Sequence, residues 1–534
     1  MRTALLVLLS VSVFAQSAER AQVDKIFSGF NTHTPGCAVG VAKDGRTVFE
    51  AGYGMADLER RVPVSSDTIF ESGSVAKQFT AAAIVLLAQK GLLSLDDPLR
   101  KHLPELRDYG SPVTIRQVLS HVSGLREWRA LAAWSAIPEG TRVFSNDDLL
   151  ELAALQRGLN FDPGSHYSYS NTGFNLLPIV VDRALKPKTF QQWTKETIFD
   201  PLGMRDTRWR DDFRTVVPRR ALAYGKSNGE WVQQTPIENI FGAGGLLTTV
   251  ADLQKWNENF TATTVGGREF VEEMQVPATL TNGRTIAYAK GLMIAAPDGV
   301  REVAHSGATG GYRTWLGRYP EKGVSVAVLC NSAEANATEL GRDTARIWTK
   351  APRLLQAAGA FHADPSTLEA LAGMYRRLRD NEVVRAVFEN GKLRFEGIGD
   401  LQPVTPGTFR TGSGAQVVFE NGPAPKFRWI DPNGETSYER VERVSPKAAD
   451  LAAYVGEYRS LETKAPLTVA MDGSRLTLKI GSGRAAELRP TFRDAFSGGP
   501  GGSAVLFLRD SSGRLTGFSA GDARTWDLRF ERIR

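Results

Sequence analysis

The chain has 534 residues, enough for two to four domains of ordinary size, so it is not one small module. Its hydrophobic fraction of 42% and charged fraction of 23% are those of a globular protein, without a long polar tract that would indicate disorder. The formal charge of +6 and the pI near 9.2 are mild for this size, and Lys and Arg are scattered. The composition therefore argues against a nucleic-acid partner.

The N-terminus has the pattern of an export signal. Arg2 precedes an apolar run from Ala4 to Phe14, and the small residues Ala15 and Ala18 suit a signal peptidase. We therefore expect residues 1–18 to be a signal peptide and the mature protein to be periplasmic or secreted. The run is too short to cross a bilayer and no later stretch reaches about 18 apolar residues, so we expect no integral membrane segment.

Cys37 and Cys330 are the two cysteines of the chain, so an oxidising compartment permits at most one internal disulfide. Both lie in apolar runs typical of strands. That placement favours two buried thiols over the alternative, a disulfide bond.

The predicted elements begin with a hairpin and a buried helix. Residues 37–43 and 47–53 are apolar or β-prone runs that flank Asp44-Gly45, a dipeptide favoured in tight hairpins. Residues 75–90 carry apolar side chains at helical spacing, and Gly91 is a plausible C-cap. This helix is apolar enough to be buried.

The middle of the chain is predicted to be mostly helical, from about residue 100 to 260. Strand character returns over residues 303–305, 314–319 and 324–331. We therefore expect an α+β domain over residues 19–355, in which a sheet made from both chain ends encloses a helical insert.

The first chemical motif is Ser74-Val75-Ala76-Lys77, at the start of the predicted helix. Ser74 then lies at the positive end of the helix dipole, and Lys77 lies one turn further along on the same face. A serine nucleophile needs a base, and a desolvated lysine near another cation can have its pKa lowered enough to serve. An N-capping serine beside a solvated lysine would explain the same residues.

The second motif is Tyr169-Ser170-Asn171, in a polar aromatic loop. A phenolate beside Lys77 could carry the proton to a leaving group, while Asn171 hydrogen-bonds a substrate amide. An ordinary turn with a hydrogen-bonded tyrosine is the alternative.

The third motif is His305-Ser306-Gly307, which ends an apolar run and precedes a glycine-rich stretch. An edge strand here could pair with an extended substrate, and its amides could complete an oxyanion hole with the Ser74 N–H. A lone histidine at a strand end is more commonly structural.

In this order and context, the three groups resemble the Ser-x-x-Lys, Tyr-x-Asn and Lys/His-x-Gly motifs of the penicillin-recognising serine enzymes. The resemblance covers about residues 24–350 and includes residues 119–125 (LSHVSGL) and 242–256 (GAGGLLTTVADLQKW). The closest branch comprises class C β-lactamases, D-alanyl-D-alanine carboxypeptidases, D-aminopeptidases and related esterases. It implies a β-lactamase/transpeptidase-like fold: an antiparallel sheet flanked by helices, plus a helical subdomain.

The resemblance also implies a role for each motif residue. Ser74 is the acylated nucleophile, and Lys77 and Tyr169 form the base system. The amides of Ser74 and Ala308 form the oxyanion hole. No metal or cofactor is implied. The residues that bind substrate are Asn171, His305, Ser306 and Gly307.

Two departures from the family pattern bear on the substrate. Val122 stands where the family's loop usually has threonine, which we expect to be harmless. His305 replaces the lysine common in β-lactamases, as it does in peptidase and esterase members. We therefore expect an amidase or peptidase that acts on small peptides or D-amino-acid amides, with a carboxylesterase or weak β-lactamase as alternatives.

After about residue 355 the chain contains an internal repeat of short β runs. Residues 373–376 (GMYR), 392–393 (KL) and 408–410 (TFR) recur 83 residues later as GEYR, RL and TFR. We predict two small antiparallel β-barrels, over residues 356–446 and 447–534. They resemble the lipocalin-like barrels that follow the catalytic domain in D-aminopeptidases, where a barrel loop can restrict substrate size. We expect the glycine-rich residues 497–503 to be the loop that covers the active site in this chain.

Three competing interpretations are weaker. Residues 517–521 (GFSAG) match a nucleophile elbow, but no histidine follows Ser519 and the next segment is strand-like. The six histidines show no close ligand pair, which argues against a metal site. The same fold could serve as a ligand sensor or binding protein, but the nucleophile and base would then have no task.

Overall fold

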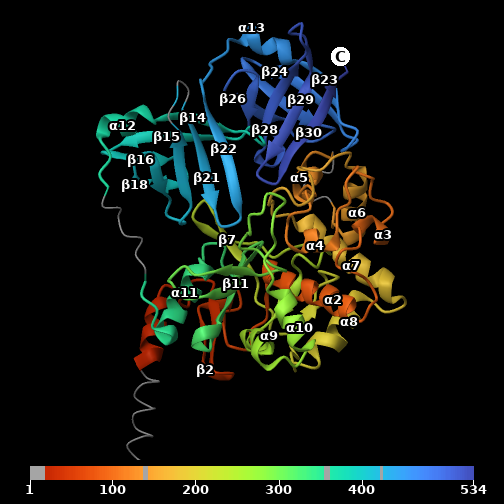
Figure 1. The fold of residues 1–534 in the computed structure, drawn as a ribbon, viewed down its shortest axis with the longest axis vertical. Helices are drawn as coiled ribbons and strands as arrows, with labels where there is room; N and C mark the ends of the chain where they lie inside the picture. Colours follow the sequence, from red (N-terminus) through yellow and green to blue (C-terminus); the bar gives the residue numbers. More distant parts are fainter. Residues whose placement is uncertain (1–17, 136–141, 354–360, 421, 423–424, 534) are drawn as a thin grey trace, which may run out of the picture.

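The computed structural model describes residues 18–135, 142–353, 361–420, 422 and 425–533. The predicted signal peptide lies outside the described residues except for Ala18, which is helical together with residues 19–26. Within the described ranges, no helix combines the length and apolarity needed to cross a bilayer. Figure 1 shows an α+β domain carrying two bodies made mainly of strands.

A six-stranded antiparallel sheet forms the centre of the α+β domain, and both ends of that domain contribute to it, as predicted. Asp44 and Gly45 both have positive φ, at 49° and 73°, which is the backbone of a tight hairpin turn between β1 and β2. The strand order is β10 (Met293–Ala295), β11 (Glu302–Thr309), β12 (Tyr312–Tyr319), β13 (Val324–Cys330), β1 (Cys37–Lys43), β2 (Arg46–Tyr53).

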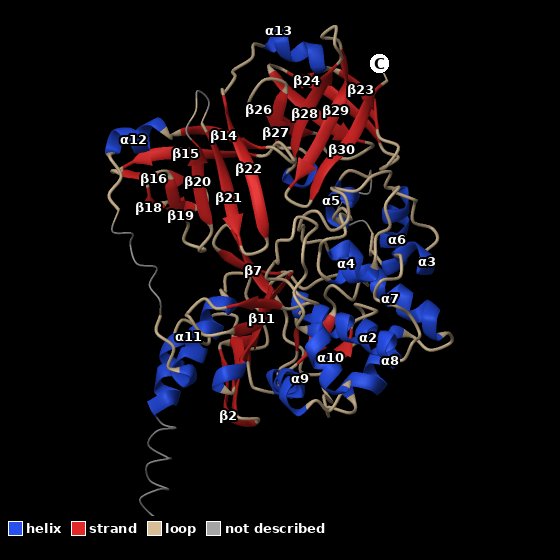
Figure 2. Cartoon of the chain, in the orientation of Figure 1, coloured by secondary structure: helices blue, strands red, loops and turns tan. Residues whose placement is uncertain are grey.

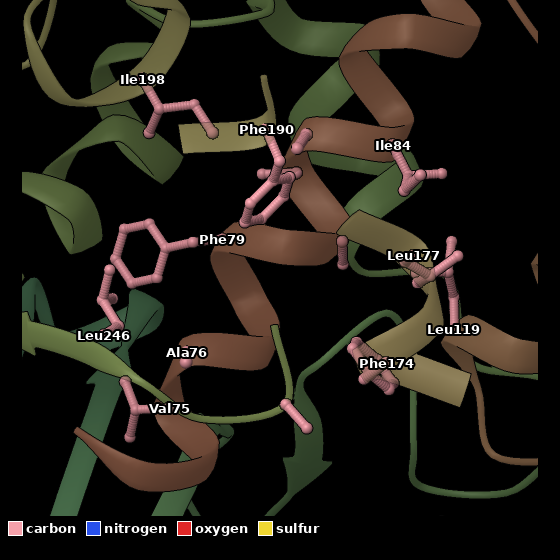
Figure 3. Packing of buried hydrophobic residues seen from close by; sticks show 14 of the residues in the cluster. Val75, Ala76, Phe79, Ile84, Leu119, Phe174, Leu177, Phe190, Ile198 and Leu246 are labelled. Carbon is pink, nitrogen blue, oxygen red and sulfur yellow. The ribbon is translucent and has the colours of Figure 1, made fainter. Parts of the chain in front are cut away.

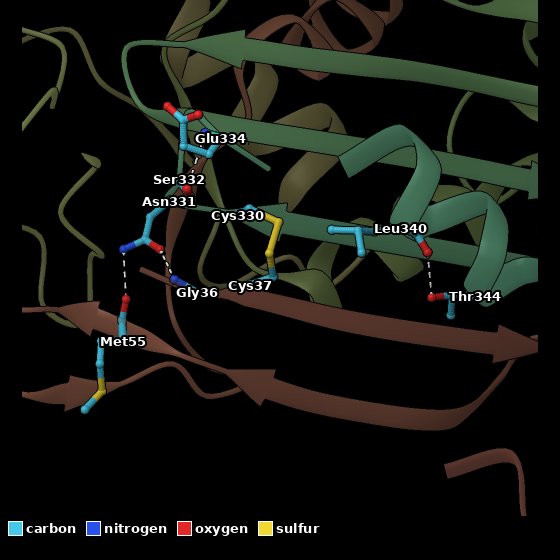
Figure 4. The surroundings of a disulfide bond; sticks show 9 residues. All are labelled: Gly36, Cys37, Met55, Cys330, Asn331, Ser332, Glu334, Leu340 and Thr344. Atoms are coloured by element: carbon cyan, nitrogen blue, oxygen red, sulfur yellow. Dashed lines mark hydrogen bonds between the residues drawn. A yellow bond between two sulfur atoms is a disulfide. The ribbon is translucent and has the colours of Figure 1, made fainter. Parts of the chain in front are cut away.

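Cys37 and Cys330 form a disulfide bond, so the prediction of two thiols is wrong. Strands β1 and β13 pair with Cys37 directly opposite Cys330, at a Cα–Cα distance of 4.0 Å (Figure 4). The apolar character of both runs correctly indicated burial. It gave no information on strand register, which is what brings the two sulfur atoms together.

Helices cover both faces of the sheet and form the subdomain beside it (Figure 2). The helix over 18–26 and α11 pack on one face, and α9 packs on the other. The helices of the domain are α2 (Lys77–Gln89), α3 (Leu99–His102), α4 (Ile115–Leu119), α5 (Trp128–Ala133), α6 (Asn146–Leu155), α7 (Asn171–Leu185), α8 (Phe190–Thr194), α9 (Val250–Ala262), α10 (Gly267–Met274) and α11 (Ala337–Thr349). Short strands connect them: β3 (Met55–Asp57), β4 (Val62–Pro63), β5 (Phe70–Glu71), β6 (Arg208–Trp209), β7 (Tyr224–Ser227), β8 (Glu230–Gln233) and β9 (Leu246–Thr248).

The predicted buried helix is α2, and it is the centre of the largest hydrophobic core. Its side chains from Lys77 to Leu87 are all buried, and Phe79 packs against Phe199 and Trp256. Leu177 of α7, Leu119 of α4 and Leu246 of β9 close around the same helix (Figure 3). A helix that is apolar on all sides in this way is held rigidly, and the residues at its N-terminus are placed accurately.

The first barrel is a nine-stranded antiparallel sheet that is nearly closed. Its end strands are β17 and β18, which do not pair with each other. Helix α12 (Pro365–Ala370) precedes it. The strands are β14 (Gly373–Arg377), β15 (Val383–Glu389), β16 (Lys392–Phe395), β17 (Gly399–Asp400), β18 (Gln402–Thr405), β19 (Thr408–Arg410), β20 (Gln416–Glu420), β21 (Lys426–Asp431) and β22 (Gly434–Val441).

The second barrel is a closed eight-stranded sheet, preceded by α13 (Ala448–Leu451). The repeat is real in three dimensions: Tyr375 and Tyr458 are both buried, and each hydroxyl donates to the carbonyl four residues earlier. The strands are β23 (Gly456–Arg459), β24 (Pro466–Asp472), β25 (Arg475–Ile480), β26 (Ala486–Pro490), β27 (Ala495–Ser497), β28 (Ala504–Arg509), β29 (Leu515–Asp522) and β30 (Thr525–Arg532).

Candidate active site

Ser74 lies in a turn of 3-10 helix (Gly73–Ala76) that leads directly into α2. Its side chain is partly exposed, and it lines a cavity of about 690 Å³. Gly73 has φ +50°, and a Cβ there would lie 2.7 Å from the Ala308 amide nitrogen. The serine turn and β11 therefore approach each other as closely as a residue without a side chain allows.

Lys77 is fully buried behind Ser74. Its Nζ lies 3.1 Å from Ser74 Oγ, and it donates to Asn171 Oδ1 and to the Ala243 carbonyl, each at 2.8 Å. Burial holds the pKa of Lys77 well below its usual range, and the charges of Arg524 and Arg129 lower it further, against an opposing effect of Glu127. A neutral amine uses both N–H groups on the two acceptors, so its lone pair is left for the Ser74 hydroxyl proton.

Tyr169, in the loop before α7, and Asn171, the first residue of α7, line the same cavity. The ring of Tyr169 has its centroid 4.8 Å from Lys77 Nζ. Burial raises the pKa of Tyr169 above its usual value, and hydrogen bonding with Ser74 opposes this only in part. Tyr169 is therefore a neutral phenol at rest, and not the phenolate that the sequence suggested as proton carrier.

Glu127 is a site residue that sequence reasoning missed. It is buried at the start of α5, and its carboxylate accepts from the Asn171 backbone N–H at 2.6 Å and from Asn171 Nδ2 at 3.0 Å. The two hydrogen bonds fix the amide so that its Oδ1 faces Lys77. The one sequence signal near Glu127 is the segment 119–125, which resembles the family and ends two residues before it. Nothing in the sequence indicates that Glu127 contacts Asn171.

Strand β11 presents an open edge to the cavity. Strand β10 pairs with it only from Glu302 to Ala304, and no described strand continues that pairing beyond Ala304. Ser306 and Ala308 are exposed there, while Gly307 is buried against the serine turn. This is the edge predicted to receive an extended substrate.

His305 lines the cavity and also belongs to a buried polar chain. The Ser170 N–H donates to His121 Nδ1 at 3.2 Å, so a neutral His121 carries its proton on Nε2, which lies 3.2 Å from the Tyr288 hydroxyl. The same hydroxyl lies 2.9 Å from His305 Nε2, and His305 Nδ1 lies 2.6 Å from the Ser306 carbonyl. Burial and the proximity of Lys77 lower the pKa of His305 to about 3, so it carries no charge at neutral pH.

The barrel segment that reaches the cavity is not the predicted one. The short helical turn Pro500–Gly502, within residues 497–503, contacts α5, where a Cβ on Gly501 would lie 3.6 Å from Ala133. The cavity is lined instead by Arg524, from the turn between β29 and β30. Length and glycine content suggested a flexible cover, whereas the actual contact comes from a two-residue hairpin turn.

Trp128 also lines the cavity, whereas Trp315 is buried in the sheet beneath α11. Ser519 lies in the middle of β29, so no nucleophile elbow exists there. Among the residues that the structure describes, no group of three or more His, Cys, Asp or Glu side chains could hold a metal ion.

Comparisons with known proteins agree with this geometry. The family model described as Beta-lactamase matches residues 23–347. The chain is 27% identical to a D-aminopeptidase of Brucella anthropi over 534 residues, covering 96% of this chain and 97% of that protein. It is 28% identical to penicillin-binding protein 4* of Bacillus subtilis over 313 residues, covering 55% of this chain and 67% of that protein.

A solved structure superposes on most of the chain. The octameric penicillin-binding protein homologue from Pyrococcus abyssi has a TM-score of 0.57 at 22% identity, covering 88% of this chain and 99% of that chain. The fold and the Ser74–Lys77 arrangement define a serine hydrolase. The chain belongs to the β-lactamase family.

Proposed function

We propose that this enzyme hydrolyses the amide bond of small peptides or amides of D-amino acids through an acyl-enzyme on Ser74. The observation that carries the proposal is Lys77: it is fully buried, and its Nζ lies 3.1 Å from Ser74 Oγ while it donates to Asn171 Oδ1 and the Ala243 carbonyl. The D-aminopeptidase relative, matched over nearly its whole length, supports the choice of substrate.

The positions of these groups define the chemistry. As Ser74 Oγ bonds to the substrate carbonyl carbon, its proton passes to Lys77 Nζ. The carbonyl oxygen becomes an oxyanion that the amides of Ser74 and Ala308 receive. The proton then passes through the Tyr169 phenol to the leaving nitrogen, and the C–N bond breaks. Water attacks the acyl-enzyme by the same route in reverse, which releases a carboxylic acid and restores Ser74.

His305 bears on the choice among substrates. It is neutral and hydrogen-bonded on both ring nitrogens, so it does not supply the positive charge that a lysine would offer to the carboxylate of a β-lactam. Asn171, with its Nδ2 held by Glu127 and its Oδ1 by Lys77, positions the base as well as the substrate.

The test compares four chromogenic substrates: D-alanine p-nitroanilide, its L enantiomer, p-nitrophenyl butyrate and nitrocefin. We expect kcat/KM to be highest for the D-anilide, and Ser74→Ala and Lys77→Met each to lower it by about 10³-fold or more. Equal rates on the two enantiomers would contradict the D specificity. Turnover of only the ester or only nitrocefin would show an esterase or a β-lactamase instead.

We also propose that the protein is exported. The pattern of residues 1–18 and the bond between Cys37 and Cys330 both fit an oxidising compartment. Cell fractionation of the native host, with the N-terminus of the mature protein sequenced, tests this. A protein found in the cytoplasm with Met1 retained would contradict it.

A further inference from the structure

Arg524 enters the catalytic cavity from the second barrel, and neither the motifs nor the mechanism above uses it. Its guanidinium carbon lies 5.0 Å from the centroid of the Tyr169 ring. It lines the same cavity as Ser74 and Tyr169, and its charge lowers the pKa of Lys77, of Tyr169 and of His121. The residue itself is exposed.

The turn that carries Arg524 is held in place from both sides. Asp522 Oδ1 accepts from the backbone N–H of Arg524 at 2.8 Å and of Thr525 at 2.7 Å. Asn160 of the catalytic domain donates to the Arg524 carbonyl at 2.7 Å and accepts from the Trp526 N–H at 3.0 Å. The turn is therefore preorganised over the cavity, which reduces the entropy lost when its side chain binds a ligand.

The other arginines of the cavity are already occupied. Arg129 pairs with Glu238 at 3.3 Å, and Arg313 donates to the carbonyls of Gly310 and Tyr312 at 2.8 Å. For the Arg524 guanidinium, no described residue forms a side-chain hydrogen bond or an ion pair. The one carboxylate on its own turn, Asp522, is engaged with backbone N–H groups.

We propose that Arg524 binds a carboxylate on the leaving-group half of the substrate. The inference rests on the proposed function, because the leaving group is defined as the half to which Tyr169 delivers its proton. Arg524 lies over that tyrosine, and a guanidinium recognises a carboxylate with two parallel hydrogen bonds. On the strand side, His305 carries no charge at neutral pH, and Arg313 of the neighbouring strand β12 already donates to two backbone carbonyls.

An Arg524 that binds a carboxylate favours a peptide whose cleaved bond precedes a residue with a free carboxylate, such as a C-terminal amino acid. A simple amide, which releases ammonia, gains nothing from Arg524. An ammonium group in the same position would be repelled.

The experiment uses a pair of esters that differ only in the leaving group: N-acetyl-D-alanine esterified to 3-hydroxybenzoate or to 3-hydroxybenzamide. The ratio of the two kcat/KM values is compared between the full-length wild type, Arg524→Met and Arg524→Glu. The matched control is Arg514→Met, a barrel arginine with a side chain 80% exposed that pairs with Asp510 and does not line the cavity.

We expect the carboxylate preference to fall about tenfold or more in Arg524→Met, to fall further in Arg524→Glu, and to stay at the wild-type value in Arg514→Met. Comparing ratios cancels any difference between the two phenols and any change in overall rate. A ratio that is the same in all four proteins overturns the inference. Because esters report on Arg524 without amide cleavage, failure on D-alanine p-nitroanilide alone would refute the proposed amidase and leave the assignment of Arg524 standing.

Discussion

Lys77 can act as a base because its burial and three charged residues around it together set its pKa. Loss of solvent has the largest effect, and Arg524 and Arg129 add to that effect while Glu127 opposes it. Glu127 also holds Asn171, so it acts on the lysine by charge and by position. It is a positioning residue, since it does not itself touch the reacting atoms.

Glu127→Gln is predicted to change both the rate and its pH dependence. Without the negative charge, the pKa of Lys77 falls further, so the acid limb of the kcat/KM profile moves to lower pH. A glutamine has one acceptor oxygen, so its NH₂ faces one of the two N–H donors of Asn171 and that hydrogen bond is lost. Asn171 is then held less firmly, and the rate at the optimum should fall about tenfold. Glu334→Gln, which removes another cavity carboxylate, should leave the acid limb in place. An unshifted profile in Glu127→Gln would exclude the electrostatic role.

His305 is predicted to make the catalytic domain acid-sensitive. Its pKa is about 3 when folded and roughly 6.5 when unfolded, so the folded state excludes a proton that the unfolded state binds. Stability from this group is complete above pH 6.5 and is lost as pH falls toward 3, by about 1.4 kcal/mol per unit. In urea unfolding, the difference in unfolding free energy between wild type and His305→Gln should be about 2 kcal/mol smaller at pH 5 than at pH 7. For His33→Gln, at an exposed position, this difference should be the same at both pH values.

At the scale of residues, the sequence predicted the side chains that carry recognisable motifs and missed those defined only by tertiary contact. Ser74, Lys77, Tyr169 and Asn171 converge as predicted. Glu127 lies 44 residues before Asn171, and Arg524 comes from the second barrel. No periodicity or motif spacing in the sequence connects either residue to the site.

At the scale of elements, local chemistry predicted what is local. The Asp44-Gly45 turn, the run that becomes α2 and the three strands β11 to β13 were all foreseen, because turn residues and apolar periodicity determine them. The pairing of β1 with β13 joins residues nearly 300 positions apart, so the disulfide between them could not be read from the sequence.

The packing of β11 on the serine turn gives a prediction about Gly307. A Cβ at Gly307 would collide with the Ser72 carbonyl and Thr314 Oγ1, which are joined by a hydrogen bond of 2.7 Å. Gly307→Ala should therefore push β11 away from Ser74, lower kcat/KM by about 100-fold and destabilise the domain by roughly 1–3 kcal/mol. Gly412→Ala, where a Cβ meets nothing within 4 Å, is the matched control and should change stability by less than about 0.5 kcal/mol. Thermal melts and single-substrate kinetics on both variants measure these effects.

At the scale of the whole molecule, the two barrels are attached through contacts that continue into the active site. The turn between β21 and β22 reaches the loop before Tyr288, where the Ala287 N–H donates to the Pro432 carbonyl at 3.1 Å. On the second barrel, Arg126 pairs with Glu462 at 2.7 Å, and both side chains are more than 90% buried. Because Arg126 is adjacent to Glu127, attachment of the barrel and orientation of Asn171 depend on the same two-residue segment. The repeat predicted that two barrels exist, but surface complementarity, which the sequence does not display, decides where they attach.

The Arg126–Glu462 pair provides a test of this attachment by a double-mutant cycle. Arg126 Nη2 also donates to the Asp527 carbonyl at 2.7 Å, and Glu462 Oε1 accepts from the Arg157 N–H at 2.7 Å, so each partner has several contacts to lose. Removing one partner leaves a buried charge, so Arg126→Met and Glu462→Leu should each destabilise the protein by about 3 kcal/mol or more. The double variant buries no unpaired charge and should recover a large part of that loss.

Activity provides an independent measurement on the same variants. If the pair holds the second barrel on the catalytic domain, Glu462→Leu should loosen the turn that carries Arg524 and reduce the carboxylate preference, with the double variant closer to wild type. The exposed pair Lys195–Asp200, with side chains 65% and 55% exposed, is the control, and its removal should cost less than about 1 kcal/mol. If the stability losses of the two single variants simply add in the double variant, and the carboxylate preference is unchanged, then other contacts hold the barrel. Because the pair is buried and surrounded by backbone hydrogen bonds, we expect the measured coupling to exceed that of the surface control severalfold.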